Sequence, residues 1–207
     1  MSCDQSKQFI LASASARRKR LLRKAGYRFE VIASNIDESG FDFEGVSSIE
    51  HTRRLGLAKA RTVAERFPAQ LVLGADTVVD FEGQIVGKPQ DAADAERITR
   101  MLFSGAHEVI TSVALVRIDD GLEIVETATT TVYPKKLTAE QIAEHIKNGD
   151  WRGKAGAYGI QETGDEFVER IEGSFTNVMG LPMELVRRLL SELIPESYRP
   201  DRRRGTY

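Results

Sequence analysis

Hydrophobic positions along the chain fall into two alternating patterns. Short apolar runs are typical of strands, whereas apolar residues spaced three or four apart are typical of amphipathic helices. Runs of the first kind lie at 9–11, 29–33, 71–81 and 84–86. Stretches of the second kind lie at about 15–25, 47–67, 91–103, 138–148 and 183–193. Ser, Thr or Asp precedes the first four of these, and Gly or Pro follows them, as expected at helix ends.

The middle of the chain departs from this alternation. Two β-rich runs, 107–118 and 122–133, are separated by Asp119-Asp120-Gly121, which predicts a β-hairpin. A Gly-rich irregular stretch covers 151–161, and 167–171 is a further candidate strand. Strands alternating with helices and then a hairpin favour an α/β protein with a mixed sheet.

Length and composition set limits on the class of protein. With 207 residues, 41% hydrophobic, the chain can form one domain of two lobes, with tails expected at 1–7 and 196–207. A net charge of −2 gives no overall basic field for nucleic acid or membranes. No apolar stretch approaches a membrane span, and the N-terminus lacks an apolar signal core. Cys3 is the sole cysteine, which excludes an internal disulfide. We therefore expect a cytoplasmic protein.

A basic cluster occupies an electrostatically unfavourable place. Ser13 or Ser15 is a suitable N-cap, which places the cations of 17–20 beside the positive end of the helix dipole. Each such charge costs a few tenths of a kcal/mol unless an anion is present. The segment therefore predicts a phosphate cradle, or else a solvated Arg-rich helix. On the first interpretation, Arg18→Ala should slightly stabilise the ligand-free protein.

Asp76 is the single charge in the apolar segment 71–79, which has the pattern of a strand covered on both faces. A buried carboxylate is costly unless it is metal-bound, paired or protonated. Each of these states suits a catalytic group. The alternative is an Asp that points into water where the strand ends.

Three weaker signals accompany Asp76. Asp37 and Glu38 follow the second strand and could place another carboxylate near Asp76, a suitable environment for Mg²⁺, although such loop pairs are usually solvated. Lys59 lies within a predicted helix, where lysines are mostly solvated. The stretch from Gly83 to Lys88 fails the P-loop spacing, and Gly87-Lys88-Pro89 is interpreted as a tight turn that fixes Lys88.

The Gly-rich stretch 153–161 has two interpretations. Its three glycines flank Lys154 and Tyr158 and would let the backbone approach a ligand closely. Gln161 carries an amide that can read a base edge. An ordinary flexible loop explains the composition equally well.

Seven short motifs together resemble one known family. They are Ser-Ala-Ser-Ala-Arg-Arg (13–18), Asp-Glu (37–38), Ala-Lys-Ala (58–60), Gly-Ala-Asp-Thr-Val-Val (74–79), Gly-Lys-Pro (87–89), Lys-Ala-Gly-Ala-Tyr-Gly-Ile-Gln (154–161) and Glu-Gly-Ser-Phe-Thr-Asn-Val-Met-Gly-Leu-Pro (172–182). Their order resembles that of Maf proteins, which are nucleoside triphosphate pyrophosphatases. The resemblance implies the fold of the inosine triphosphate pyrophosphatases, an elongated mixed sheet with flanking helices and a cleft between two lobes.

The resemblance also implies residue roles. Asp76 would accept the proton of the attacking water and, with Glu38, bind Mg²⁺ or Mn²⁺. The triphosphate would be held by Ser13, Arg18, Lys59 and Lys88. Base selection would involve Arg17, Thr77 and Gln161, where Arg and Gln match the dTTP/UTP subgroup and Trp and Glu would indicate 7-methylguanosine triphosphate.

Two sequence features depart from the family pattern. Ala16 replaces the usual Pro, and 162–166 is unusually acidic. The resemblance implies a possible homodimer and leaves an alternative function open. Maf proteins have been linked to inhibition of septum formation, so a regulatory or nucleic-acid-binding role with little catalysis competes with the enzyme. No basic and aromatic strand surface for nucleic acid is evident, which favours the enzyme.

Overall fold

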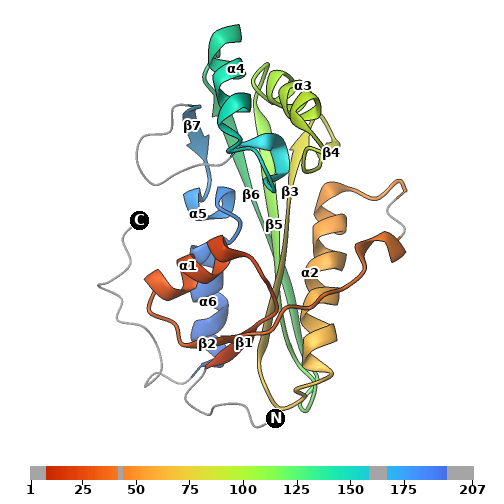
Figure 1. Cartoon of the computed structure of the whole chain (residues 1–207). Coiled ribbons are helices and arrows are strands. Elements are labelled where there is room, and N and C mark those ends of the chain that lie inside the picture. The colour runs from red at the N-terminus through yellow and green to blue at the C-terminus, as the bar shows by residue number, and fades with distance from the viewer. Residues whose placement is uncertain (1–7, 42–43, 159–166, 195–207) are drawn as a thin grey trace.

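One long mixed sheet runs through the molecule and carries helices on both faces (Figure 1). The computed structural model describes residues 8–41, 44–158 and 167–194. The predicted tails, 1–7 and 196–207, lie outside these residues, as does Gln161. The strands are β1 (Phe9–Leu11), β2 (Phe29–Val31), β3 (Val72–Phe81), β4 (Gln84–Val86), β5 (His107–Arg117), β6 (Leu122–Pro134) and β7 (Val168–Glu172). The α-helices are α1 (Ala16–Lys24), α2 (Ser48–Ala64), α3 (Ala92–Leu102), α4 (Ala139–Asn148), α5 (Phe175–Val178) and α6 (Met183–Leu193).

The strand order confirms the predicted mixed sheet. The order is β2-β1-β3-β5-β6-β7, and β4 folds back onto β3. Strand β1 is parallel to both β2 and β3, whereas β3, β5, β6 and β7 pair antiparallel. The predicted hairpin is β5–β6, and its long strands extend through both halves of the molecule (Figure 1).

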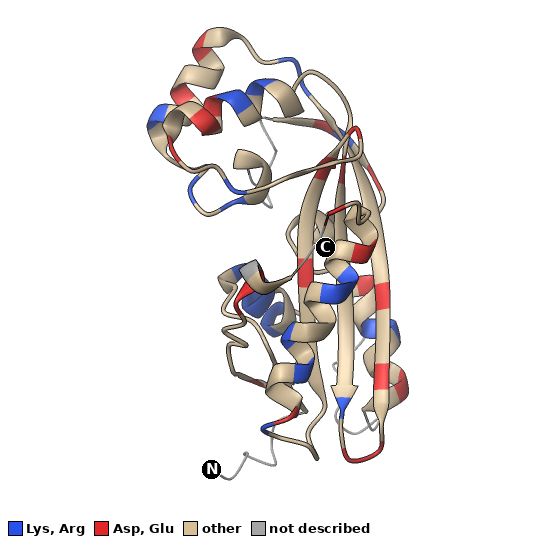
Figure 2. Cartoon of the chain, turned by 90° about the vertical axis from the view of Figure 1, so that its right-hand side faces the viewer, with Lys and Arg blue, Asp and Glu red and all other residues tan. Residues whose placement is uncertain are grey.

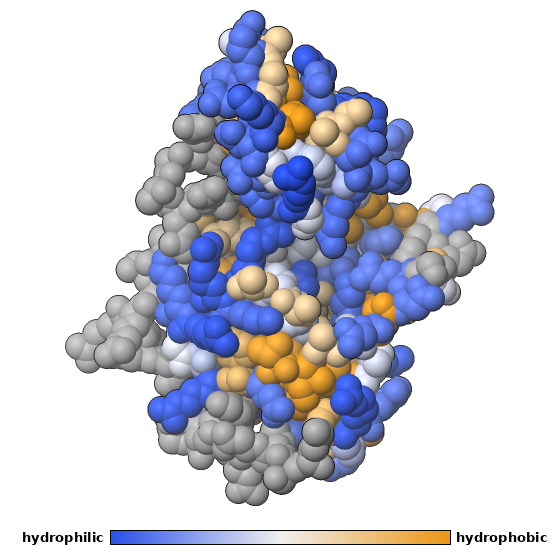
Figure 3. Space-filling view, viewed as in Figure 1, coloured by the Kyte–Doolittle hydropathy of each residue, from blue (hydrophilic) through white to orange (hydrophobic). Residues whose placement is uncertain are grey.

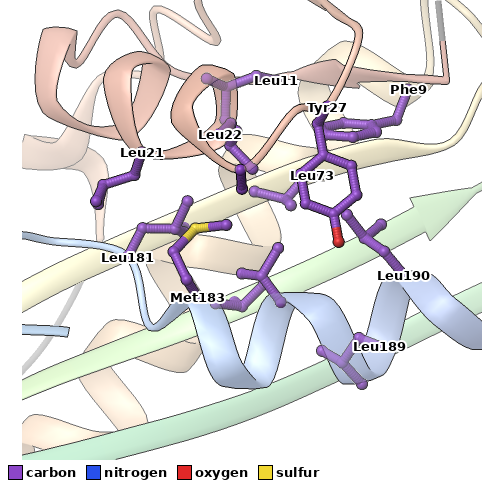
Figure 4. Packing of buried hydrophobic residues seen from close by; sticks show 14 of the residues in the cluster. Phe9, Leu11, Leu21, Leu22, Tyr27, Leu73, Leu181, Met183, Leu189 and Leu190 are labelled. Atoms are coloured by element: carbon purple, nitrogen blue, oxygen red, sulfur yellow. The ribbon is translucent and has the colours of Figure 1, made fainter. Parts of the chain in front are cut away.

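Alternate residues of β3 serve different cores, as the period of a strand requires. Leu73 packs in the cluster formed with α1 and α6, shown in Figure 4, whereas Val72 packs in the cluster formed with α2. These two clusters make a base lobe. A third cluster, with residues of α3 and of the segment 151–158, makes a distal lobe around the far end of β3 and β5. On the face seen in Figure 3, the largest group of exposed apolar residues lies in the lower part of the base lobe.

The helix ends follow the predicted capping residues. Ser47, Asp91 and Thr138 cap α2, α3 and α4, and Thr138 forms a capping box with Gln141. Of the two candidates before α1, Ser15 is the cap. The pattern did not predict α5 or the two short 3₁₀ helices, Glu38–Gly40 and Ala155–Ala157, which are too short for a periodic signal. Within the described residues, no helix is both long and apolar enough to cross a bilayer.

Two glycines let α2 approach β3 at the level of their backbones. A Cβ on Gly74 would lie 2.5 Å from the carbonyl oxygen of Gly56 and 2.7 Å from the nitrogen of Ala60. A Cβ on Gly56 would lie 3.2 Å from the carbonyl oxygen of Ser112. The two residues at this contact therefore have to be small, and the contact fixes the height of α2 above the sheet.

We predict that Gly74→Ala destabilises the protein by about 3 kcal/mol, because the added methyl group overpacks a contact between backbones that cannot shift independently. Urea unfolding measures the change. Gly105→Ala is the control, since its Cβ would meet nothing closer than Phe81 Cε2 at 3.8 Å. Equal stability of the two variants would contradict a tight α2–β3 contact.

Candidate active site

A cleft of about 930 Å³ lies where the base lobe meets the distal lobe. Its walls come from the end of β1 and start of α1, the middle of β3, α2, the turn after β4, and residues 152–158 and 178–180. The predicted site residues that line it are Ser13, Arg17, Arg18, Glu38, Lys59, Asp76, Thr77 and Lys88. The fold thus brings together side chains that are widely separated in sequence.

The cleft opens along an edge of β3. Strand β1 pairs with β3 as far as Leu73, and β4 begins to pair only at Val79. Among the described residues, positions 74–78 therefore have no strand on this side. Because Asp76 and Thr77 point to opposite faces, an open edge lets both side chains reach the same cleft. The predicted cover on both faces of this strand is confirmed, whereas the apolar pattern did not indicate the open edge.

Asp76 is a buried carboxylate paired with a lysine. Its Oδ1 lies 2.7 Å from Nζ of Lys59, and the same ammonium lies 2.8 Å from Oε1 of Glu38. The side chains of Asp76 and Lys59 are only 11% and 14% exposed, whereas that of Glu38 is 55% exposed. Of the three states that sequence allowed for Asp76, the structure has the ion pair.

The position of Lys59 follows from the fold. Lys59 stands three residues after Gly56 on α2, and Asp76 stands two residues after Gly74 on β3, so the close glycine contact brings the ammonium onto the carboxylate. Glu38 begins a 3₁₀ helix and completes the triad. Two carboxylates around one positive charge also fit a divalent cation whose other ligands are phosphate oxygens and water. Within the described ranges no cluster of three or more His, Cys, Asp or Glu could hold a metal.

The position of Arg18 at the start of α1 suggested that it faces phosphate or solvent, but its guanidinium is bonded to acceptors within the protein. Its guanidinium donates to the carbonyl oxygens of Ala75 at 2.8 Å and Gly180 at 2.9 Å, and to Oγ1 of Thr77 at 2.9 Å. The carbonyls of Leu71 and Leu73 accept from β1, and Ala75 is the next carbonyl in that row. Arg18 therefore satisfies the open edge where β1 stops.

These contacts reverse the stability expected from the dipole argument, because Arg18→Ala would leave buried acceptors without a donor. Burial lowers the pKa of Arg18, and the negative charge of Asp76 is the largest opposing influence. Ser13 Oγ also accepts from Arg18, at 3.3 Å, and thereby helps to orient it. No feature of the sequence had indicated an internal partner for this cation.

The motif 172–182 has a supporting role that the sequence did not reveal. Ser174 caps α5, and Asn177 Nδ2 donates to the carbonyl oxygens of Val109 and Ala128 on the sheet. These bonds hold the turn that presents the Gly180 carbonyl to Arg18. Polar residues within an otherwise apolar segment were the available signal, since buried polar groups need hydrogen-bond partners.

Positive charge dominates the walls of the cleft. Six Lys or Arg residues line it against two carboxylates, in a chain of net charge −2. In Figure 2, Lys and Arg occur on the parts of both lobes that face each other. No ion pair joins Arg17, Lys88 or Lys154 to an acid among the described residues. Such a surplus is suited to a polyanionic ligand.

His51, which the sequence patterns did not single out, lines the cleft from α2. Burial lowers its pKa, and the carboxylates of Asp76 and Glu38 act in the opposite direction. Asn35 and Arg152 are further lining residues that sequence did not single out. Isolated polar residues of these kinds carry no periodic or motif signal.

Comparisons with known proteins find relatives that this chain matches over most of its length. The dTTP/UTP pyrophosphatase of Citrifermentans bemidjiense is 43% identical over 179 residues, covering 86% of this chain and 92% of that protein. The dTTP/UTP pyrophosphatase of Bdellovibrio bacteriovorus is 44% identical over 186 residues, covering 88% and 97%.

A solved structure, the Ham1 protein of Staphylococcus aureus, is 15% identical and covers 63% of this chain and 73% of that one, with a TM-score of 0.44, too low to add to the argument. The profile of the Maf-like protein family matches residues 8–193. This match spans both lobes and every described residue of the cleft, so the chain belongs to the Maf-like protein family.

Proposed function

We propose that this protein is a nucleoside triphosphate pyrophosphatase that hydrolyses dTTP and UTP to the monophosphate and pyrophosphate. The observation that carries the proposal is a buried carboxylate, Asp76, at the wall of a cleft with six cationic side chains. The named activity of relatives more than 40% identical over most of the chain supports the same substrates.

In this reaction a water oxygen bonds to the α-phosphorus while the bond between that phosphorus and the α–β bridging oxygen breaks, and pyrophosphate leaves. Asp76 accepts the proton of the water, a role that contributes roughly 10²- to 10⁴-fold in enzymes. The ammonium of Lys59 holds Oδ1, so Oδ2 is the oxygen left to receive the proton. Cations around the phosphates stabilise the charge that develops, which is the main requirement of phosphoryl transfer.

Asp76 and Glu38 would also hold a divalent cation, Mg²⁺ or Mn²⁺, when one is bound. The ammonium of Lys59 lies between these two carboxylates, which supports the view that the space between them favours a positively charged group. Such a cation would neutralise phosphate oxygens and polarise the attacked phosphoryl group. Lys59, whose ammonium has three donors, would keep its contact with Oδ1 of Asp76 and also bind a phosphate oxygen, in keeping with the triphosphate role that the family resemblance implies.

Base selection would involve Arg17, Thr77 and Gln161. Arg17 lies in the first turn of α1 and lines the cleft. Burial lowers the pKa of Arg17, and the positive charge of Arg20 lowers it further. The hydroxyl of Thr77 is held by Arg18 and Thr111, which fixes it at the wall. The amide of Gln161 offers both a donor and an acceptor, which suits uracil and thymine.

A panel of nucleotides tests the proposal directly. We expect pyrophosphate rather than orthophosphate as product, with dTTP and UTP preferred, CTP behind them and purine triphosphates poor. The panel is run with Mg²⁺ and with Mn²⁺, and again with EDTA, which is expected to abolish turnover. Absence of pyrophosphate from every nucleotide with either metal would refute the proposed activity.

We predict that Asp76→Asn reduces kcat on dTTP by at least 100-fold, because the amide cannot accept a proton. Nucleotide binding, measured by calorimetry, should change far less. Asp119→Asn, in the exposed β5–β6 turn, is the matched control and should retain full activity. A loss well below 100-fold would argue against Asp76 as the general base.

We predict that Arg18→Ala lowers the free energy of unfolding by about 2 kcal/mol, because the carbonyl oxygen of Ala75 loses its side-chain donor and that of Gly180 keeps only the bond from Thr77 Oγ1 at 3.3 Å. Turnover should also fall, since Asp76 directly follows Ala75 and the hydroxyl of Thr77 accepts a hydrogen bond from Arg18. Arg20→Ala is the control, an exposed cation of the same helix whose removal should leave stability unchanged or slightly higher. A stable, slow Arg18→Ala variant would instead assign Arg18 to the substrate alone.

We predict that Arg17→Trp combined with Gln161→Glu lowers kcat/KM for UTP and raises it for 7-methylguanosine triphosphate. An indole stacks on a cationic base, and an ionised carboxylate accepts from its donor-rich edge. The measurement is the ratio of the two kcat/KM values, compared with each single variant. If the unaltered protein already prefers a purine triphosphate, this assignment of the two residues fails while the reaction class can stand.

A further inference from the structure

The segment 149–158 is held in an unusual backbone conformation at the wall of the cleft. Gly156 has φ of 74° and Ala157, a non-glycine residue, has φ of 60°. A Cβ on Gly156 would lie 3.0 Å from Leu102 Cδ1 and 3.1 Å from Val79 Cγ2, so the segment packs tightly on α3 and β3. Backbone held in a sparsely populated region where the surroundings enforce it is a frequent feature of ligand sites.

Hydrogen bonds fasten this segment to its neighbours. The N–H of Gly156 donates to the carbonyl oxygen of Gly87 at 3.2 Å, which joins the segment to the turn that carries Lys88. The imidazole Nε2 of His145 lies 2.8 Å from the carbonyl oxygen of Ala157. The left-handed turn is therefore built into the distal lobe, and it has a fixed place beside Lys88.

Lys154 is one of the side chains that this segment places in the cleft. It is only partly exposed, lines the cleft, and has no ion-pair partner among the described residues. Arg152, the other cation of the segment, has its guanidinium over the Trp151 ring, 4.9 Å from the ring centroid. Within the described part of the chain, Lys154 is thus the cation of this segment that no aromatic ring or acid engages. A partly buried ammonium without a partner favours binding of an anion.

The distance along β3 between Asp76 and the segment 149–158 suggests which phosphates of a nucleotide Lys154 would contact. Gly156 packs on Val79, three residues beyond Asp76, a separation of about 10 Å along a strand. The proton-accepting carboxylate belongs beside the α-phosphorus, where the water attacks. Phosphates that extend from there toward the distal lobe reach the turn with Lys88 and the segment with Lys154.

We propose that Lys154, together with Lys88, binds the β- and γ-phosphates and so holds the pyrophosphate leaving group. This inference rests on the proposed pyrophosphatase function. As the bond from the α-phosphorus to the α–β bridging oxygen breaks, its electron pair stays on that oxygen of the departing pyrophosphate. The ammonium of Lys154 stabilises the added charge without transferring a proton. The base lobe would thus bind the attacked phosphate and the distal lobe the departing ones.

Product inhibition separates this role from a general electrostatic effect. Lys154→Gln keeps most of the side-chain stem and removes the charge, and Lys154→Arg restores a cation. Lys147→Gln is the matched control, because Lys147 is exposed on α4 of the same lobe and does not line the cleft. For each protein we would measure KM for dTTP and the inhibition constants of pyrophosphate and dTMP, with circular dichroism to verify folding.

We expect Lys154→Gln to raise both KM for dTTP and the inhibition constant of pyrophosphate about tenfold, as loss of one charge-assisted contact implies. The inhibition constant of dTMP should stay within twofold, Lys154→Arg should recover most of the loss, and Lys147→Gln should match the unaltered protein. Unchanged pyrophosphate inhibition in Lys154→Gln would overturn the inference, as would a rise for dTMP alone or an equal effect of Lys147→Gln.

Direct calorimetry with pyrophosphate keeps the test independent of turnover. If the unaltered protein binds pyrophosphate and Lys154→Gln binds it about tenfold more weakly, the inference stands even where the nucleotide panel fails. If the panel succeeds and pyrophosphate binding is equal in both proteins, the inference fails while the proposed activity stands.

Discussion

The site depends on an interruption in the pairing of β3. Between the end of β1 and the start of β4, residues 74–78 of β3 pair with β5 on one side and have no strand on the other side among the described residues. A strand edge exposes backbone carbonyls that need donors, and Arg18 supplies one to Ala75 where a strand would otherwise continue. The same opening lets side chains from both faces of β3 reach one cleft. The site thus forms because β1 ends early and leaves one edge of β3 open, and Arg18 of α1 stabilises that edge.

The second constraint is the height of α2 above the sheet. Gly56 and Gly74 let the two backbones approach closely enough for Lys59 to reach Asp76. A buried carboxylate is costly without a partner, so a larger residue at either glycine would disturb both packing and the ion pair. Stability and chemistry therefore share one contact, and the motif Gly-Ala-Asp combines the small residue with the charged one.

The sequence predicted the helices and strands well, but it predicted the contacts between distant segments less well. Periodicity and capping residues located the long helices and the β5–β6 hairpin, because these signals are local. The partner of Arg18 could not be predicted from the pattern, since the carbonyls of Ala75 and Gly180 come from segments far along the chain and carry no side-chain signal. Asp76 was recognised as an exception in an apolar run, yet only the fold shows that Lys59 pairs with it.

The charges of the cleft are divided between the two lobes that share the sheet. Asp76 and Glu38 belong to the base lobe, whereas Lys88 and Lys154 lie on the distal lobe. Cations without acid partners repel one another and destabilise the ligand-free cleft, and a bound polyanion relieves that repulsion. Because β3 runs continuously from Asp76 to the packing contact of Gly156 on Val79, the spacing between the carboxylate and the distal cations is set by a rigid strand. The continuous sheet therefore fixes the distance between Asp76 and the cations of the distal lobe, and this distance suits an extended ligand such as a chain of phosphates.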